Sequence, residues 1–461
     1  MAIQSTTRAL GPLLSVVLLL AAMCQVAGAA AKTGTALPID PVFNGGQPMQ
    51  VTLPSGEAIE YANDVAAIAS GRVIVISGDH LIAFNPDGTR ASEFGVGGVQ
   101  DVDLSKSIPK SKGGHGFQME ALESTTDGGF VVLGVGNSLV RVAFPVVAKF
   151  DANGRLDATF GKNGYAVLKH NGGETTDDGS VQSHRLAIAR SGEIAVASEE
   201  WLKPENGLIV SVMSPAGKVR KTYGHRGSAW IGYKRELGWT NEIGAVTFDP
   251  KGRILVTGYI GTLESCDPDL CIPTYEGQPI QFVARLDRQG NLDHTFSRDG
   301  YAEPKKATLG CPTIGLKVTS RGTIYLANQC GYVVRLGSSG NQDASFRGRA
   351  RFQYPPSEAP PVGDELLHLD KSGKVSLSGW SKLDPRKELV SLVLQQVKPN
   401  GVDRTSASMR NLSANKFDDP SGAIGRSFVL DYDAADNPLL ASTRLDPTTG
   451  KPTVYLARFT R

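Results

Sequence analysis

Short runs of apolar residues, separated by turn-forming residues, recur along almost the whole chain. Residues 147–164 read VAKFDANGRLDATFGKNG: an apolar strand, a turn with glycine, a D-x-x-F-G-x-x-G element and the start of another strand. Apolar runs of this length joined by Gly, Asn and Asp turns are typical of β-hairpins. The sequence lacks a sustained apolar stripe at the 3.6-residue helical period. The pattern therefore predicts an all-β chain.

Variants of this stretch repeat along the chain. Its turn glycine has counterparts at spacings of 66, 63, 73, 50 and 61 residues, namely Gly88, Gly154, Gly217, Gly290, Gly340 and Gly401. A seventh copy begins at 456–459 and stops at the end of the chain. A second unit, two apolar runs around a tight turn, precedes each copy, so each repeat of about sixty residues offers four strands.

Seven copies of a four-stranded unit are typical of a β-propeller, whereas a linear solenoid would need capping repeats at its ends. The two ends of the chain favour closure. Residues 39–53 supply a D-x-x-F element and a fourth strand, and residues 456–459 supply a third strand that lacks its fourth. We therefore predict one domain over 32–461, a seven-bladed β-propeller of four-stranded antiparallel blades. Residues 47–53 are expected to pair with residues 454–459 and close the ring.

Residues 147–164 and 283–300 match closely the pattern V-A-[RK]-[LF]-D-x-x-G-x-L-D-x-x-F-G-x-x-G. This pattern resembles the delta-60 repeat of exported bacterial proteins, and the resemblance extends loosely over about 40–461. It implies a propeller-type array. It implies no catalytic residue, because the family carries none that is assigned.

The recurring positions of the motif read as scaffold. We expect its aromatic residue to wedge between neighbouring blades, at Phe43, Phe94, Phe160, Tyr223, Phe296 and Phe346. The carboxylate three residues earlier should accept backbone N–H bonds, at Asp40, Asp157, Asp293 and Asp343. The glycine four residues later should adopt positive φ, at Gly98, Gly164, Gly227 and Gly300. The copy at Gly401 has Ala407 in the aromatic position, so we expect the loosest blade there, with its loop 404–426 the most mobile.

Composition and the N-terminus indicate an exported soluble protein. The chain has 461 residues, 40% of them hydrophobic and 20% charged, and a net charge of +2 without a long Lys/Arg run, which argues against a nucleic-acid partner. Residues 1–31 combine Arg8, an apolar run over 10–23 and small residues at 27–31, the pattern of a secretory signal peptide. An uncleaved membrane anchor is the alternative. We expect a periplasmic or extracellular monomer that begins near Lys32, with no membrane segment after cleavage.

The four cysteines beyond the signal peptide fit two disulfides. Cys311 and Cys330 lie at the two ends of a hairpin whose turn is at 320–322, so antiparallel pairing would place them opposite each other. Cys266 and Cys271 could close a short loop. The alternative is a zinc site of four thiolates, which the lack of C-x2-C spacing and the export signal disfavour.

The sequence contains no strong catalytic, cofactor-binding or metal-binding motif, so we expect no cofactor and no resident metal. The acidic cluster over 431–437 fails the spacing of an EF-hand, and we interpret its carboxylates as turn residues.

Propellers place function where loops enter the innermost strands. The candidate ligand-binding residues of this funnel are Asp64, Glu120, His184, Glu242 and Glu365. Two function classes stay open. One is a non-enzymatic scaffold that binds a protein, a polymer or a small polar ligand; the other is a propeller-type hydrolase, lyase or lactonase. An enzyme would require at least three of the five to meet within side-chain reach.

Overall fold

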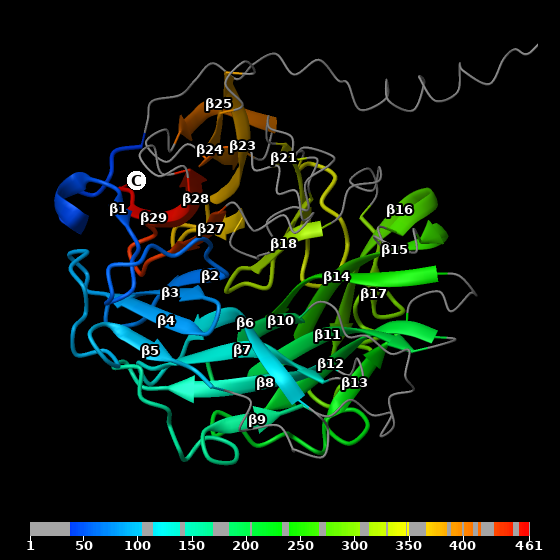
Figure 1. Cartoon of the computed structure of the whole chain (residues 1–461). Helices are drawn as coiled ribbons and strands as arrows, with labels where there is room; N and C mark the ends of the chain where they lie inside the picture. Colours follow the sequence, from blue (N-terminus) through cyan, green and yellow to red (C-terminus); the bar gives the residue numbers. More distant parts are fainter. Residues whose placement is uncertain are drawn as a thin grey trace, which may run out of the picture.

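The computed structural model describes residues 37–103, 114–138, 143–168, 184–202, 205–232, 239–266, 273–304, 313–328, 331–346, 348–349, 366–384, 389–398, 401–408, 414–415, 428–445 and 451–460. These residues form seven antiparallel sheets arranged around a ring (Figure 1). The predicted all-β, seven-bladed propeller is confirmed. In these ranges, the one helical element is the short 3-10 turn η1 (Phe43–Gly46), and no helix reaches the length and hydropathy of a membrane span.

Each of the first six blades is made of consecutive strands, numbered from the centre of the ring outward. Blades 1 and 2 contain β2 (Asp64–Ala67), β3 (Val73–Ser77), β4 (His80–Phe84), β5 (Val99–Asp101), β6 (Gly114–Ser124), β7 (Phe130–Ser138), β8 (Ala143–Phe150) and β9 (Tyr165–Val167). Blades 3 and 4 contain β10 (His184–Ile188), β11 (Ile194–Leu202), β12 (Glu205–Met213), β13 (Ser228–Ile231), β14 (Trp239–Phe248), β15 (Ile254–Cys266), β16 (Pro273–Leu286) and β17 (Tyr301–Ala302).

Blades 5 and 6 contain β18 (Thr313–Val318), β19 (Ile324–Asn328), β20 (Tyr332–Leu336), β21 (Gly348–Arg349), β22 (Leu367–Leu369), β23 (Val375–Asp384), β24 (Leu389–Lys398), β25 (Gly401–Ser408) and β26 (Ala414–Asn415). Blade 7 contains β27 (Phe428–Tyr432), β28 (Pro438–Leu445), β29 (Pro452–Arg458) and, from the other end of the chain, β1 (Met49–Gln50). The first strands of blades 1 to 6 contact one another in ring order, and β27 contacts β2, so these strands surround the central channel.

The ring is closed by the two ends of the chain, as predicted. Met49 and Gln50 pair with Leu456 and Tyr455 as the outer strand of blade 7. Arg458 Nε donates to Asp40 Oδ2 at 2.7 Å, across 418 positions of sequence. The guanidinium of Arg458 also lies over the ring of Phe43, 5.1 Å from its centroid. Figure 1 shows the red C-terminal strands beside the blue N-terminal segment.

The motif aromatics wedge between blades, also as predicted. All six are buried. The rings of Phe94, Phe160, Tyr223 and Phe296 each meet the turn that follows the third strand of the next blade, and beside Phe43 the N–H of Asn44 donates to the carbonyl of Asp87 in the same turn of blade 1. A Cβ on Gly154 would lie 2.6 Å from the ring of Phe94, and Gly95 N donates to Asn153 O across the same seam at 3.1 Å. The same arrangement recurs for Phe160 with Gly217, Tyr223 with Gly290, and Phe296 with Gly340.

The expected roles of the motif carboxylates and glycines are confirmed. An oxygen of each carboxylate accepts the N–H two residues later, at Asp40, Asp157, Asp293 and Asp343. The other oxygen faces a cation on the third strand of the same blade, at 2.9 Å for Arg285 Nε to Asp293 Oδ2. The following glycines have φ of 86°, 94°, 103° and 92°, at Gly98, Gly164, Gly227 and Gly300.

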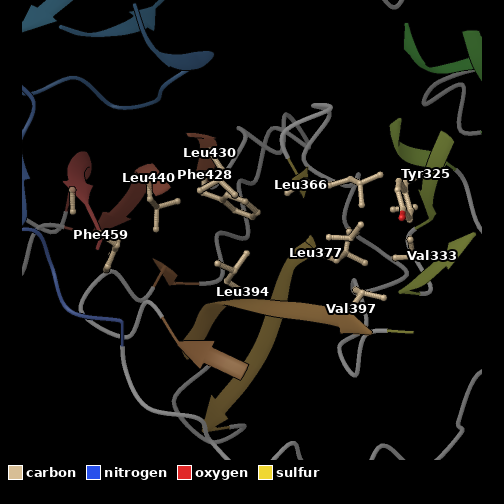
Figure 2. Close-up of a cluster of buried hydrophobic side chains, with 14 of the residues drawn as sticks. Tyr325, Val333, Leu366, Leu377, Leu394, Val397, Phe428, Leu430, Leu440 and Phe459 are labelled. Carbon is tan, nitrogen blue, oxygen red and sulfur yellow. The ribbon is translucent and has the colours of Figure 1, made fainter. Parts of the chain in front are cut away.

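Blade 6 departs from the repeat, and one expectation about it is wrong. Residues 404–408 belong to β25 instead of a loop, because Lys398 pairs directly with Gly401 and the chain returns at once along β24. Arg404 and Ala407 replace the carboxylate and the aromatic residue of the motif. The motif turn is therefore missing, and the fourth strand directly follows the third. The cluster in Figure 2 joins this blade through Leu377 and Leu394 to blades 5 and 7. The rest of the expected mobile loop lies outside the described residues, apart from β26.

Candidate functional site

Four of the five sequence-predicted funnel residues lie in innermost strands. Asp64 begins β2, Glu120 belongs to β6, His184 begins β10 and Glu242 lies in β14. The side chains of His184 and Glu242, and the whole of Glu365, lie outside the described residues. The convergence of the five side chains therefore stays a prediction.

Asp64 joins blade 1 to blade 2. Its Oδ1 accepts the N–H of Val65 at 2.8 Å, and its Oδ2 accepts the N–H of Leu122 at 2.8 Å. Leu122 lies in β6, so the second bond crosses between the innermost strands of adjacent blades. Hydrogen bonds to a charged acceptor contribute more to stability than neutral ones. Asp64 therefore has a structural task at the channel.

Three other charged side chains cross blade seams close to the innermost strands. Asp431 Oδ2 accepts from Ala67 N at 3.0 Å and joins blade 7 to blade 1. Glu199, only 4% exposed, accepts from Ile243 N through Oε1 at 2.7 Å and joins blade 3 to blade 4. Arg185 Nε donates to the carbonyl of Gly244 at 2.9 Å across that same seam.

Buried neutral groups make similar contacts between blades 4 and 5. Thr257 Oγ1 lies 3.4 Å from Thr313 Oγ1 and donates to the carbonyl of Phe282 at 2.8 Å. Gln281 Nε2 donates to Thr313 Oγ1. The other amide atom of Gln281, Oε1, is buried without a protein partner in the described part of the chain. This cluster is sealed, since Gln281 is 2% exposed and Thr257 is 0% exposed.

The seam between blades 6 and 7 holds a histidine. The ring of His368 stacks on Tyr432 with centroids 3.6 Å apart, and its Nε2 lies 3.1 Å from Asp436 Oδ1. Tyr432 in turn shares a hydrogen bond of 3.2 Å with Ser378, which is 0% exposed. Ser378 cannot meet a substrate from that position, so the group is a packing contact between blades.

Clearly shifted pKa values occur in two turns of the blades. A hydrogen bond from Lys149, followed by one from Thr125, lowers the pKa of Asp127 to about 2. Hydrogen bonds from Ser345 and then Arg335 lower the pKa of Asp343 to about 2. Both carboxylates stay ionised in their turns, of which one follows the innermost strand β6 and the other follows the third strand β20. Among the described residues, no three His, Cys, Asp or Glu side chains gather as metal ligands.

The predicted disulfides lie almost wholly outside the described residues. Cys266 is the last residue of β15, whose backbone pairs with Pro273 of β16. Nothing is described for its side chain, or for Cys271, Cys311 and Cys330. Both pairings therefore stay predictions.

Two seam residues, Glu199 and Asp431, are not among the functional positions that the sequence predicts. Glu199 lies on a second strand, β11, where the repeat comparison places no functional position. The sequence places Asp431 in a cluster of turn carboxylates, but it belongs to β27 and bonds to blade 1. A sequence feature could have identified both residues. Each is an acidic residue in an otherwise apolar strand pattern, and such a residue needs a buried partner.

Comparisons with known proteins leave the function open. No protein-family profile matches the chain, and no curated protein matches it. Similar solved structures include a protein of unknown function from Dyadobacter fermentans, with 13% identity and a TM-score of 0.40 over 74% of this chain and 94% of that one. A gluconolactonase from Xanthomonas campestris has 11% identity and a TM-score of 0.33 over 93% and 98%. YCF48 bound to D1 peptide has 10% identity and a TM-score of 0.39 over 93% and 98%. Likenesses this distant carry no argument about activity.

Proposed function

We propose that this propeller is a binding scaffold without catalytic activity, which presents one face to a partner or a small polar ligand. The supporting observation is the set of hydrogen bonds that Asp64 accepts. Both of its carboxylate oxygens accept backbone N–H groups, one of them from the next blade. A carboxylate held in this way is poorly placed to exchange protons with a substrate, because its lone pairs already stabilise the ring.

The test is a ligand screen with the purified chain beginning at Lys32. Sugars, short peptides and divalent cations are screened by thermal shift, and bound metal is measured by elemental analysis. A ligand at 100 times its Kd stabilises the folded state by about 2.7 kcal/mol, which a thermal shift detects easily. The same ligands are then assayed for turnover, alongside ester, lactone and uronate-polymer substrates. We expect stabilisation by one class of ligand and no turnover.

Asp64→Asn separates the two function classes. An amide must turn its NH2 group toward one of the two donors, so we expect a loss of about 1–3 kcal/mol in the free energy of unfolding. Asp249→Asn is the control: its carboxylate is likewise engaged at both oxygens, by Lys251 N and Arg253, but in the turn between β14 and β15. Turnover that Asp64→Asn abolishes and Asp249→Asn spares would overturn the scaffold role.

The N-terminal pattern and the cysteines support an exported location and two disulfides as further parts of the proposal. N-terminal sequencing of the secreted or periplasmic protein should begin near Lys32. Mass spectrometry without reduction should join Cys266 to Cys271 and Cys311 to Cys330. Membership of the delta-60 repeat family is proposed on the motif residues alone.

A further inference from the structure

One turn element of the propeller differs in charge from its counterparts. Blades 1 to 4 each carry a 14-residue element between the third and fourth strands, at 85–98, 151–164, 214–227 and 287–300. Counting Lys and Arg minus Asp and Glu gives 1 − 2 = −1, 2 − 2 = 0, 4 − 0 = +4 and 2 − 3 = −1. The element of blade 3 therefore carries four cations and no carboxylate.

The excess positive charge arises because this blade lacks the ion pair that the motif forms between its turn carboxylate and a cation of the third strand. In blades 2 and 4 the carboxylates Asp157 and Asp293 face cations of their third strands. In blade 3, Arg220 occupies the position of the carboxylate. The buried Val212 occupies the position of the third-strand cation. The blade has lost an internal ion pair, and its turn has gained cations that the motif does not require.

The cations of blade 3 are held close together on a compact turn. A Cβ on Gly227 would lie 2.5 Å from Val219 Cγ1, so the two ends of the element pack against each other. Lys218 and Arg226 each lie one residue before a member of this contact. Arg226 has φ of +55°, the left-handed conformation that Asn163 adopts at the same position of blade 2. An arginine is costlier there than an asparagine.

Most of this charge is available to a partner. Lys218, Lys221 and Arg226 are exposed, and none has an ion pair within the described part of the chain. Arg220 is the exception, with Nη1 3.1 Å from Glu193 Oε1, a contact that ties the element to the β10–β11 turn. That turn adds the exposed Arg190.

In the described part of the chain, neither neighbouring blade pairs a carboxylate with these cations. On the blade 2 side, Gly161 N donates to Ala216 O at 2.8 Å, and the next residue is the exposed Lys162. On the blade 4 side, Gly224 N donates to Gln289 O at 2.6 Å. The carboxylate at the start of that turn, Asp287, has one oxygen engaged by two backbone N–H groups of its own turn.

We propose that the basic turn of blade 3, residues 214–227 with Arg190, is a docking surface for an acidic polysaccharide. A polymer with carboxylate or sulfate groups on successive sugars matches several clustered, exposed cations on a rigid turn. A membrane surface fits less well, because the exposed large hydrophobic side chains of the described residues, Val42, Tyr61 and Val96, lie outside blade 3. A nucleic acid fits less well, because the aromatic residue of the turn, Tyr223, is buried and offers no stacking face.

The test compares binding by the full chain and by Lys218→Asn/Lys221→Ala/Arg226→Asn. Each replacement is the residue that another blade has at that position, namely Asn291, Ala158 and Asn163, so the turn should fold. These replacements lower the net charge of the element from +4 to +1. Fluorescently labelled heparin and alginate report affinity by anisotropy at several salt concentrations. We expect affinity to fall about tenfold or more, and the dependence of log Kd on log salt to weaken.

Arg298→Asn/Arg321→Asn is the matched control, because it removes two exposed cations from blades 4 and 5. Its affinity should change less than about twofold, since only the clustered charge of blade 3 is proposed to hold the polymer. Unchanged binding by the triple variant, or an equal loss in the control, overturns the proposal. Tighter binding to anionic vesicles or to single-stranded DNA than to either polysaccharide also overturns it.

This inference deepens the proposed binding role, and the two can fail separately. If the triple variant binds polysaccharide like the wild type while a neutral ligand still stabilises the protein, only the basic turn is wrong. If the protein turns over a substrate while the triple variant alone loses polysaccharide binding, only the non-catalytic role is wrong.

Discussion

At the scale of single residues, the motif joins three interactions that each depend on the others. Arg285 donates from Nε to Asp293 at 2.9 Å and lies 4.4 Å from the ring centroid of Phe296. Asp293 also accepts the N–H of Thr295 at 3.0 Å, which fixes the turn that carries the ring. The carboxylate thus neutralises a nearly buried guanidinium and shapes the turn, and the cation covers the wedge between blades.

Tyr223→Phe should stabilise the protein. Tyr223 holds the wedge position of blade 3, where its hydroxyl is buried without a protein partner among the described residues, and burial raises its pKa. Removing an unsatisfied buried hydroxyl should raise the free energy of unfolding by about 1 kcal/mol. Urea titration measures the change. Phe160→Tyr, the reciprocal change at the same position of blade 2, should destabilise by about 1–3 kcal/mol. A loss of stability in Tyr223→Phe would contradict this account.

Two turn carboxylates should make the fold acid-sensitive. The pKa values of Asp127 and Asp343 are lowered to about 2, below the ordinary value of about 3.9 for an unfolded chain. A depressed folded-state pKa means that the stabilisation is complete above pH about 4 and is lost as the pH falls toward about 2. Thermal melting across this acidic range should follow that window. Asp343→Asn should flatten the profile; a profile identical to that of the wild type would refute the assignment.

At the scale of elements, the wedge contact can be separated from backbone strain by two glycines. Gly154 has φ of +77° and lies against the ring of Phe94, whereas Gly128 has φ of +91° and open space within 4 Å of where a Cβ would lie. Gly128→Ala should cost about 1–2 kcal/mol, the penalty of left-handed backbone alone. Gly154→Ala should cost about 1–3 kcal/mol more, because the methyl group would overpack the seam. Equal losses in urea titrations would show that the ring does not constrain the turn.

The elements also show where sequence patterns are sufficient and where they are not. The repeat predicts strand number, the wedge residues and the turn carboxylates, because each depends on local spacing that recurs in several blades. It cannot predict the early fourth strand of blade 6, since the copy at Gly401 has lost the residues that define the turn. The hydrogen bond between blades made by Asp64 is equally unpredictable from the sequence. Its Oδ2 accepts the N–H of Leu122, and these two residues come close only because two blades pack against each other.

At the scale of the whole molecule, stability should depend on closure by the N-terminal segment. Residues 37–53 complete blade 7 with the strand pairing of Met49, the buried ring of Phe43 and the ion pair of Asp40 with Arg458. Burying Phe43 alone contributes about 1.5–3 kcal/mol. A chain that begins after residue 53 leaves β29 without its partner strand β1, although Val454 N can still donate to Ile59 O. The cation of Arg458 also loses Asp40. We expect it to melt well below a chain that begins at Leu37, and to aggregate through the exposed edge.

A synthetic peptide of residues 37–53, added in trans, distinguishes closure from a general effect of truncation. The peptide should raise the melting temperature of the shortened chain in a concentration-dependent way, since it binds the folded state alone. A peptide with Asp40→Asn and Phe43→Ala keeps the strand residues 49–50 but lacks the ion pair and the wedge, so it should rescue much less. If the shortened chain were as stable as the longer one, the packing between blades would hold the ring together without residues 37–53. If both peptides rescued equally, strand pairing alone would close the ring.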